Sequence, residues 1–162
     1  MTSIAIIGGG ITGVTTAYAL AKRGLSVTLF ERQRYAGMET SFANGGQLSA
    51  SNAEVWNHPS TILKGLKWML KSDAPLLMSP APTWHKLSWM AEFVAAIPKY
   101  KDNTVATAQL AIASREHHFA WAKAEGIDFD HKREGILHIY RDKKGFDHAG
   151  EVSKLLAQGG LP

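Results

Sequence analysis

Two short apolar runs flank an amphipathic stretch near the start of the chain. Both runs, around Ile6 and Leu29, contain β-branched residues and predict strands over residues 3–7 and 26–30. The stretch between them predicts a helix over residues 11–23, because apolar side chains recur there at three- and four-residue steps. Both strands are apolar on both faces, which is typical of parallel strands covered by two layers. The pattern therefore predicts a strand–helix–strand unit with parallel strands.

Farther along the chain, the apolar positions take on a mostly helical spacing. Residues 32–57 are polar and rich in turn-forming types, and three prolines make residues 73–83 a predicted loop. Residues 129–133 and 135–141 predict a β-hairpin, since the second segment is rich in strand-forming side chains. Gly126 is expected to end the longest helix. The helices themselves are expected over residues 61–71, 85–97, 103–125 and 144–158.

The composition is that of an ordinary soluble globular protein. Apolar residues make up 45% and charged residues 20% of the 162 positions, enough for one domain with a core. The absence of cysteine excludes disulfides, thiolate metal sites and thiol nucleophiles. The sequence contains no recognisable signal peptide and no long apolar run, so we expect a cytoplasmic chain. The formal net charge of +4 is modest, and no nucleic-acid-binding module is recognised.

A glycine-rich sequence follows the first predicted strand directly. Gly8, Gly10 and Gly13 have the G-x-G-x-x-G spacing of a dinucleotide-binding turn. Gly8 would let the chain leave the strand sharply, Gly10 would let the backbone approach a pyrophosphate, and Gly13 would let the helix pack on the sheet. Ile11 and Thr12 begin the helix, where free N–H groups and the positive end of the dipole favour phosphate. The alternative interpretation is a tight turn that binds nothing.

An acidic residue ends the second predicted strand, where units of this kind bind a ribose. Glu31 is placed to accept hydrogen bonds from ribose hydroxyls, and a tight turn alone would not require it. Its charge disfavours a 2′-phosphate, whereas the adjacent Arg32 weakens that preference. The glycines and the acid together favour a dinucleotide site over a plain turn.

Two further features have both a functional and a purely structural interpretation. Hydroxyls and glycine amides in the loop that follows Glu31 could reach a cofactor or simply form turns, and we favour the cofactor. The helix over residues 61–71 has lysines on one face and apolar side chains on the other. That helix fits either a membrane surface or packing on its own domain, and we favour packing.

Seven histidines raise the question of a metal site. His117 and His118 are adjacent, so their side chains point to different faces of a helix. The other histidines lack the short, regular spacing of metal ligands. The sequence therefore predicts no metal site.

Four segments together make the chain similar to a known flavoprotein family. It resembles the N-terminal part of the FAD-dependent D-amino-acid dehydrogenases, within the D-amino-acid oxidase-like flavoproteins. The first segment below is shared by many FAD and NAD proteins, whereas the second is much more specific to this group. The segments are IAIIGGGITGVTTAYALAKRGLSVTLFE at residues 4–31, ETSFANGGQLSAS at 39–51, LKWMLKSDAPL at 66–76 and GILHIYR at 135–141.

The resemblance implies a set of FAD-binding residues. Gly8, Gly10 and Gly13 would hold the pyrophosphate, while Ile11 and Thr12 start the helix behind it. Toward the adenosine end, Glu31 would bind the ribose and Arg32 would lie beside the adenine. The following loop would place Thr40 and Ser41 on the pyrophosphate side and would run past the flavin through Asn44, Gly45, Gly46, Gln47 and Leu48.

The resemblance also implies a fold and a reaction. The expected fold class is α/β, with a Rossmann-like βαβ FAD-binding unit followed by a mostly helical start of a substrate domain with a β-hairpin. The expected domains are a partial FAD-binding domain at residues 1–57 and a partial substrate-binding domain at 58–162. The implied reaction oxidises a D-amino acid to a 2-oxo acid and ammonia by hydride transfer to flavin, with a membrane quinone or another electron acceptor.

Members of this family are much longer than the present chain. We therefore expect a fragment that is inactive alone, with the catalytic residues in a missing C-terminal portion or another subunit. The expected localisation is cytoplasmic or peripheral on the inner face of the cell membrane. Two alternatives remain open: another amine-oxidising flavoenzyme of the sarcosine- or glycine-oxidase kind, and a non-catalytic module that binds NAD.

Overall fold

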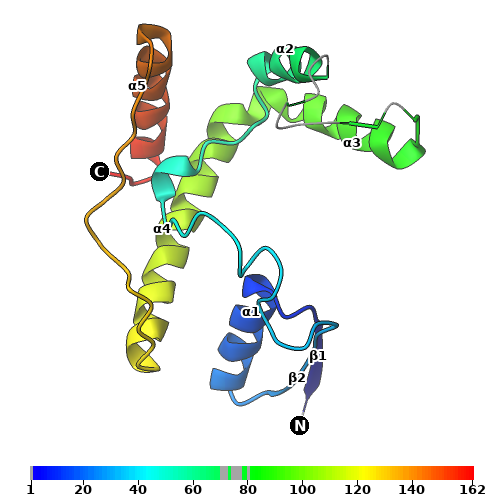
Figure 1. Cartoon of the computed structure of the whole chain (residues 1–162), viewed down its shortest axis with the longest axis vertical. Coiled ribbons are helices and arrows are strands. Elements are labelled where there is room, and N and C mark those ends of the chain that lie inside the picture. The colour runs from blue at the N-terminus through cyan, green and yellow to red at the C-terminus, as the bar shows by residue number, and fades with distance from the viewer. Residues whose placement is uncertain (1, 70–72, 74–77, 80) are drawn as a thin grey trace. The chain divides into compact units, whose positions relative to one another are not determined.

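The computed structural model describes residues 2–69, 73, 78–79 and 81–162 (Figure 1). Within this part of the chain there are two compact units, Met1–Gln47 and Leu48–Pro162. The predicted domain assignment, with its boundary after residue 57, stays a prediction, because compactness does not tell what a unit binds.

The first unit is the predicted strand–helix–strand unit. It consists of β1 (Ser3–Ile7), α1 (Ile11–Lys22) and β2 (Ser26–Phe30). The strands are parallel, with Ile4 opposite Val27, and α1 contacts both of them. The helix ends at the expected place, because Gly24 adopts a left-handed φ of +78° that suits glycine. Both strands and the helix are confirmed, and the fold class is mixed α/β as predicted.

One face of this two-stranded sheet is uncovered within the described residues. Ile6 and Leu29 are half-buried, and Ile6 lies close to the start of α1. Ile7 and Phe30 are 92% and 56% exposed. The prediction that both faces of the strands are buried is therefore wrong for this unit. A single helix provides one covering layer, and parallel strands need a second layer to bury the other face.

The second unit is mostly helical. Its elements are η1 (Ala50–Asn52), α2 (Pro59–Trp68), α3 (Trp84–Ala95), η2 (Ile97–Lys99), α4 (Tyr100–Ala124) and α5 (Lys143–Gln158). Side chains cap three of the helices, since His58, Thr83 and Asp142 accept backbone N–H groups at the starts of α2, α3 and α5. The four predicted helices are confirmed with small shifts at their ends. The predicted end of the first of them at Lys71, and part of the predicted loop over residues 73–83, lie outside the described residues.

The core of the second unit lies where η1 and α5 meet α4. Thr104 and Ala108 of α4 are fully buried, and Ala108 packs with Leu156 and Ala53. The Thr104 hydroxyl accepts a hydrogen bond from the Val55 N–H at 3.3 Å, so this buried polar group is satisfied. No helix of the described residues combines the length and the apolar character needed to cross a membrane.

We expect Gly159→Ala to loosen the packing of α5 on α4. A Cβ at Gly159 would lie 2.8 Å from the Ala108 Cβ and 2.9 Å from the Val105 carbonyl oxygen. The expected loss in the free energy of unfolding is about 1–3 kcal/mol, as for other overpacked cores. Urea unfolding followed by circular dichroism measures it. Gly150→Ala, with open space around its Cβ in α5, is the matched control, and an equal loss in both variants would refute the contact.

The predicted β-hairpin over residues 129–133 and 135–141 is not present. Among the described residues the sheet of β1 and β2 is the only one, and residues 127–140 form no strand. Leu137 and Ile139, which favoured the strand, are 84% and 81% exposed. Their β propensity finds no neighbouring strand, and propensity without cross-strand partners does not make a sheet.

Aromatic contacts with α4 replace strand pairing in this segment. The rings of Phe129 and His131 are stacked, with centroids 4.6 Å apart. The guanidinium carbon of Arg133 lies 3.8 Å from the centroid of the Phe119 ring on α4, in a cation–π contact. Asp130 has a left-handed φ of 54°, which interrupts an extended strand. Residues 129–133 therefore lie against α4 as an irregular chain.

Candidate cofactor site

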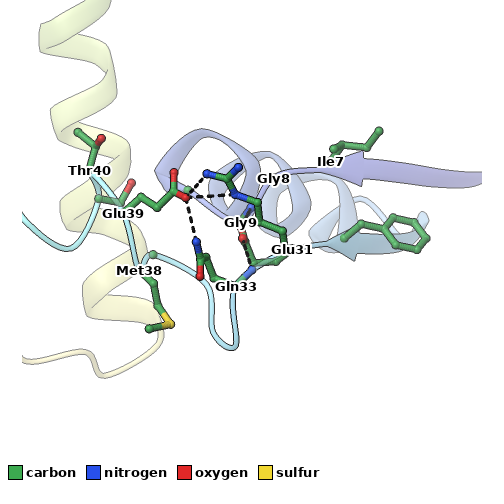
Figure 2. Close-up of a pocket in the computed structure, with 13 residues that line it drawn as sticks. Ile7, Gly8, Gly9, Glu31, Gln33, Met38, Glu39 and Thr40 are labelled. Carbon is green, nitrogen blue, oxygen red and sulfur yellow. Dashed lines mark hydrogen bonds and ion pairs between the residues drawn. The ribbon is translucent and has the colours of Figure 1, made fainter.

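A pocket of about 360 Å³ opens at the carboxyl ends of β1 and β2. Its walls are the ends of both strands, the glycine turn and the loop after β2 (Figure 2). Ligands of open α/β sheets bind at this edge, outside the carboxyl ends of parallel strands. The topology of the first unit thus places the pocket where a nucleotide site is expected.

The glycine turn is shaped by close backbone approach. Gly8 has a left-handed φ of +102°, which suits glycine and turns the chain out of β1. A Cβ at Gly13 would lie 1.8 Å from the Gly8 carbonyl oxygen, so a side chain at this position would push α1 away from the turn. A Cβ at Gly10 would lie 3.4 Å from the Ser41 Oγ and would narrow the pocket beside the start of α1. Position 13 therefore requires glycine because a side chain would clash with the turn, and position 8 favours glycine because of its left-handed backbone conformation.

The start of α1 is held by a hydroxyl from the loop after β2. The Ile11 N–H donates to the Ser41 Oγ at 2.9 Å, and Gly10, the residue before the helix, provides no side-chain cap. The first N–H groups of a helix have no acceptor within it, so the adjacent amides, such as that of Thr12, are suited to an anion. The Ser41 hydroxyl accepts from Ile11 and still has its own proton to donate.

Glu31 connects the end of β2 to the glycine turn. Its Oε2 accepts a hydrogen bond from the Gly9 N–H at 2.5 Å, and its Oε1 accepts one from the Gln33 N–H at 2.8 Å. These bonds, that of Gln33 first, hold the pKa of the Glu31 carboxyl below its ordinary value of 4.5. Each carboxylate oxygen has two lone pairs, so the ionised group can accept ribose hydroxyls as well.

The lowered pKa of Glu31 predicts an acid-side loss of stability in the first unit. The two N–H groups stabilise the ionised carboxylate, so its contribution is complete above the ordinary pKa and is lost as the pH falls through the lower folded value. We therefore expect the free energy of unfolding to rise with pH between those two values. Glu31→Gln is expected to flatten that part of the curve, measured by urea unfolding at a series of pH values. If the free energy of unfolding changed with pH equally in both proteins, the assignment of this pH dependence to Glu31 would be contradicted.

The loop after β2 folds back over the turn. The Gly37 N–H donates to the Gly9 carbonyl at 2.8 Å. The Glu39 carboxylate accepts from the side chains of Arg32 and Gln33, which lowers the pKa of Glu39 and raises that of Arg32. Together these bonds hold the loop against the glycine turn and against the end of β2.

Asn44 gives the next part of the loop its shape. Its Nδ2 donates to the carbonyls of Thr40 at 3.1 Å and Ser41 at 3.2 Å, while its Oδ1 accepts the Gly46 N–H at 2.8 Å. An asparagine that bonds its own backbone in this way stabilises a turn. The amide of Asn44 is thus engaged with the loop itself.

The structure brings about half of the predicted cofactor-binding residues to one pocket. The lining includes Gly8, Gly10, Glu31, Arg32, Thr40 and Ser41. Ile11, Thr12 and Gly13 lie behind it, in the first turn of α1. Asn44, Gly45, Gly46 and Gln47 follow on the loop and do not line it, and Leu48 belongs to the second unit. The individual roles of these residues in cofactor binding stay predictions.

Several lining residues were missed by sequence reasoning. Gly9, Gln33 and Glu39 take part in the hydrogen bonds that shape the pocket, and Met38 is part of its wall. Gly9 is a variable position of the glycine motif, so its spacing carried no signal. Glu39 begins the specific motif at residues 39–51, which was the available signal for it.

The residues of the pocket fit FAD. The absence of a side chain at Gly10 leaves room beside the Ser41 Oγ, and the start of α1 offers amides to a pyrophosphate. The Glu31 carboxylate lies at the end of β2, where a ribose is bound in units of this topology. An anion site and a hydroxyl acceptor in one pocket match the pyrophosphate and the ribose of an adenosine diphosphate group.

Comparison with known proteins identifies the family. The profile of the FAD dependent oxidoreductase family matches residues 3–162. The chain is 65% identical over 161 residues to D-amino acid dehydrogenase 3 of Mesorhizobium japonicum, covering 99% of this chain and 39% of that protein. It is 39% identical over 160 residues to D-amino acid dehydrogenase of Dechloromonas aromatica, covering 98% of this chain and 38% of that protein. A further D-amino acid dehydrogenase, of Paramagnetospirillum magneticum, is 38% identical over 165 residues.

The chain thus spans about two fifths of the length of these curated relatives, 39% of the first of them. No solved structure matches it. The family match covers both units, including the glycine turn, Glu31 and the loop that closes the pocket. The chain therefore belongs to the FAD dependent oxidoreductase family, whose cofactor is FAD.

Proposed function

We propose that this chain supplies the FAD-binding part of a D-amino-acid dehydrogenase, which oxidises D-amino acids to 2-oxo acids and ammonia. The observation that carries the proposal is the hydrogen bond of 2.5 Å between the Gly9 N–H and the Glu31 carboxylate. It joins the glycine turn, where the phosphates would lie, to Glu31, which would accept the ribose hydroxyls. The names of the relatives in three organisms support D-amino acids as the substrate class.

The residues of the pocket would bind and orient the cofactor. The start of α1, which follows the glycine turn, would hold the pyrophosphate, to which the Ser41 hydroxyl would donate its remaining proton. Glu31 would accept the adenosine ribose hydroxyls. FAD, when bound, supplies the hydride-accepting centre for the substrate.

The acceptor of the electrons belongs to the same proposal. The relatives carry the name dehydrogenase, which is used for enzymes that reduce an acceptor other than oxygen. We accordingly propose a quinone or a similar acceptor, and a peripheral position at the inner face of the cell membrane. The substrate-binding and catalytic side chains would come from sequence that the longer relatives contain beyond the matched part.

A substrate panel on the full-length protein tests the proposal. The purified protein is expected to show the visible absorption of bound flavin. With an artificial electron acceptor under anaerobic conditions, D-alanine is expected to yield pyruvate and ammonia, whereas L-alanine is not. Replacing the acceptor by a soluble quinone analogue is expected to maintain turnover, and oxygen is expected to support it poorly.

Each alternative predicts a different result in the same panel. Turnover of N-methylglycine but not of D-alanine would overturn the proposal in favour of an amine oxidase of the sarcosine or glycine kind. Binding of NAD without flavin would overturn it in favour of a non-catalytic dinucleotide-binding module. Fast reaction with oxygen but not with the quinone analogue would refute the proposed acceptor.

A further inference from the structure

One carboxylate oxygen in the wall of the pocket accepts hydrogen bonds from two side chains. The Glu39 Oε1 accepts a hydrogen bond from the Arg32 Nε at 3.2 Å and a shorter one from the Arg32 Nη2. The same oxygen accepts from the Gln33 Nε2 at 3.1 Å (Figure 2). The guanidinium is therefore turned toward Glu39.

The position of Arg32 gives this pairing a consequence for nucleotide choice. Arg32 directly follows Glu31 at the end of β2, and both residues line the pocket where an adenosine ribose would lie. An arginine near this place is the group that accommodates a 2′-phosphate in sites for phosphorylated dinucleotides. Arg32 is also the one lysine or arginine that lines the pocket in the described part of the chain. Whether the guanidinium of Arg32 is free to bind a 2′-phosphate would therefore determine the affinity of the pocket for nucleotides that carry one.

We propose that Glu39 is a specificity-determining residue of the nucleotide site. By holding the guanidinium of Arg32, Glu39 lowers the affinity of the pocket for adenine nucleotides that carry a 2′-phosphate. The inference rests on the proposed function, because it assumes that an adenosine ribose lies at Glu31. Glu31 and Glu39 then act together: the first places a negative charge at the ribose, and the second neutralises the nearest positive charge.

The exposure of the pair argues for a role in selectivity rather than in folding. The side chains of Arg32 and Glu39 are 78% and 55% exposed. An ion pair this accessible to water contributes little to the stability of a fold. Its charges nevertheless remain at the rim of a site for an anionic ligand, where they change the local field. Removal of the Glu39 charge is thus expected to alter ligand preference while the unit stays folded.

Two ligands that differ by a single phosphate test the proposal. Full-length protein freed of flavin is titrated with 5′-AMP and with adenosine 2′,5′-bisphosphate, each in competition with FAD, whose fluorescence reports its own binding. Glu39→Gln retains the size of the side chain and an acceptor oxygen but loses the charge. It is expected to raise the affinity for the bisphosphate about three- to fivefold while the affinity for 5′-AMP changes by less than about twofold, in the range of an exposed ion pair.

Two further variants assign the effect to Arg32. Adding Arg32→Gln to Glu39→Gln is expected to remove the gain for the bisphosphate, since no guanidinium is left to receive the phosphate. Glu151→Gln is the matched control, because Glu151 is also an exposed glutamate, paired with Lys154 at 2.8 Å in the second unit. It makes the same change in net charge and is expected to leave both affinities unchanged.

The outcomes separate the inference from the proposed function. An unchanged ratio of the two affinities in Glu39→Gln, with FAD and 5′-AMP still bound, would overturn the role of Glu39 alone. Equal loss of both ligands in that variant would show a general positioning role and would also overturn it. Failure of the unmodified protein to bind FAD and 5′-AMP would overturn the proposed function itself.

Discussion

Gly13→Ala is expected to abolish FAD retention by the full-length protein. The added Cβ would lie 1.8 Å from the Gly8 carbonyl oxygen, far inside van der Waals contact. That oxygen belongs to the backbone, and Gly8 is held by a hydrogen bond of 2.8 Å from its N–H to the Phe30 carbonyl. The turn cannot yield without breaking its link to β2, so α1 must move instead. We expect a cost of about 3 kcal/mol or more, at the upper end for overpacked sites.

The flavin content and the unfolding curve of the variant measure this effect. Gly65→Ala is the matched control, because Gly65 is also a helical glycine but has open space where a Cβ would lie. Alanine in an unobstructed helix is expected to be stabilising by up to about 1 kcal/mol. The same Gly→Ala change is thus expected to lower the free energy of unfolding at Gly13 and to raise it at Gly65. Full flavin content in the Gly13 variant would refute the close approach of α1 to the turn.

The first unit could be predicted from the sequence because its determinants are local. The strand and helix patterns, the glycine spacing and the acid at Glu31 all lie within one continuous stretch, and each points to the same unit. Gly13 shows this most clearly, since its place in the motif predicted the close packing that its geometry displays. The left-handed φ of Gly24 likewise fits its predicted place at the end of α1.

The predictions that failed depend on whether another segment of structure packs or pairs with the strand, and not on the local sequence pattern. The interpretation of β1 and β2 as apolar on both faces suggested a second covering layer, yet Ile7 is 92% exposed among the described residues. Similarly, Ile139 has the propensity of a strand but no strand beside it in the described part of the chain. Propensity tells which conformation a segment favours, and it does not tell whether another segment is available to pair with it.

The hydrogen bonds of the pocket are a third kind of feature, for which the sequence made no prediction. Glu39 lies in a recognised motif, but its contact with Arg32 depends on how the intervening loop turns back. No regular spacing encodes such a contact, because the loop has neither the helical nor the strand period. The sequence thus indicated where the site lies, while the structure was needed to show which donors each carboxylate engages.

Glu31→Gln is expected to weaken FAD binding by roughly ten- to hundredfold. Hydrogen bonds to a charged group contribute about 1.5–3 kcal/mol, and each 1.4 kcal/mol corresponds to about a factor of ten. The carboxylate accepts from Gly9 with one oxygen and from Gln33 with the other. An amide has a single acceptor oxygen, so its NH2 group would face one of these two N–H donors. The substitution therefore disturbs the turn as well as the ribose contact.

Titration of FAD into flavin-free full-length protein, followed by flavin fluorescence, measures the loss. Glu134→Gln is the matched control, because this glutamate is exposed and lies outside the pocket, and its variant is expected to bind FAD normally. Equal affinity of the Glu31 variant and the unmodified protein would contradict the ribose assignment. A loss that persists at high salt would point to the two N–H bonds and the ribose contact rather than to long-range charge, since salt screens exposed charges over about 10 Å or less. The geometry favours a loss that persists at high salt, because both bonds to Glu31 are short and direct.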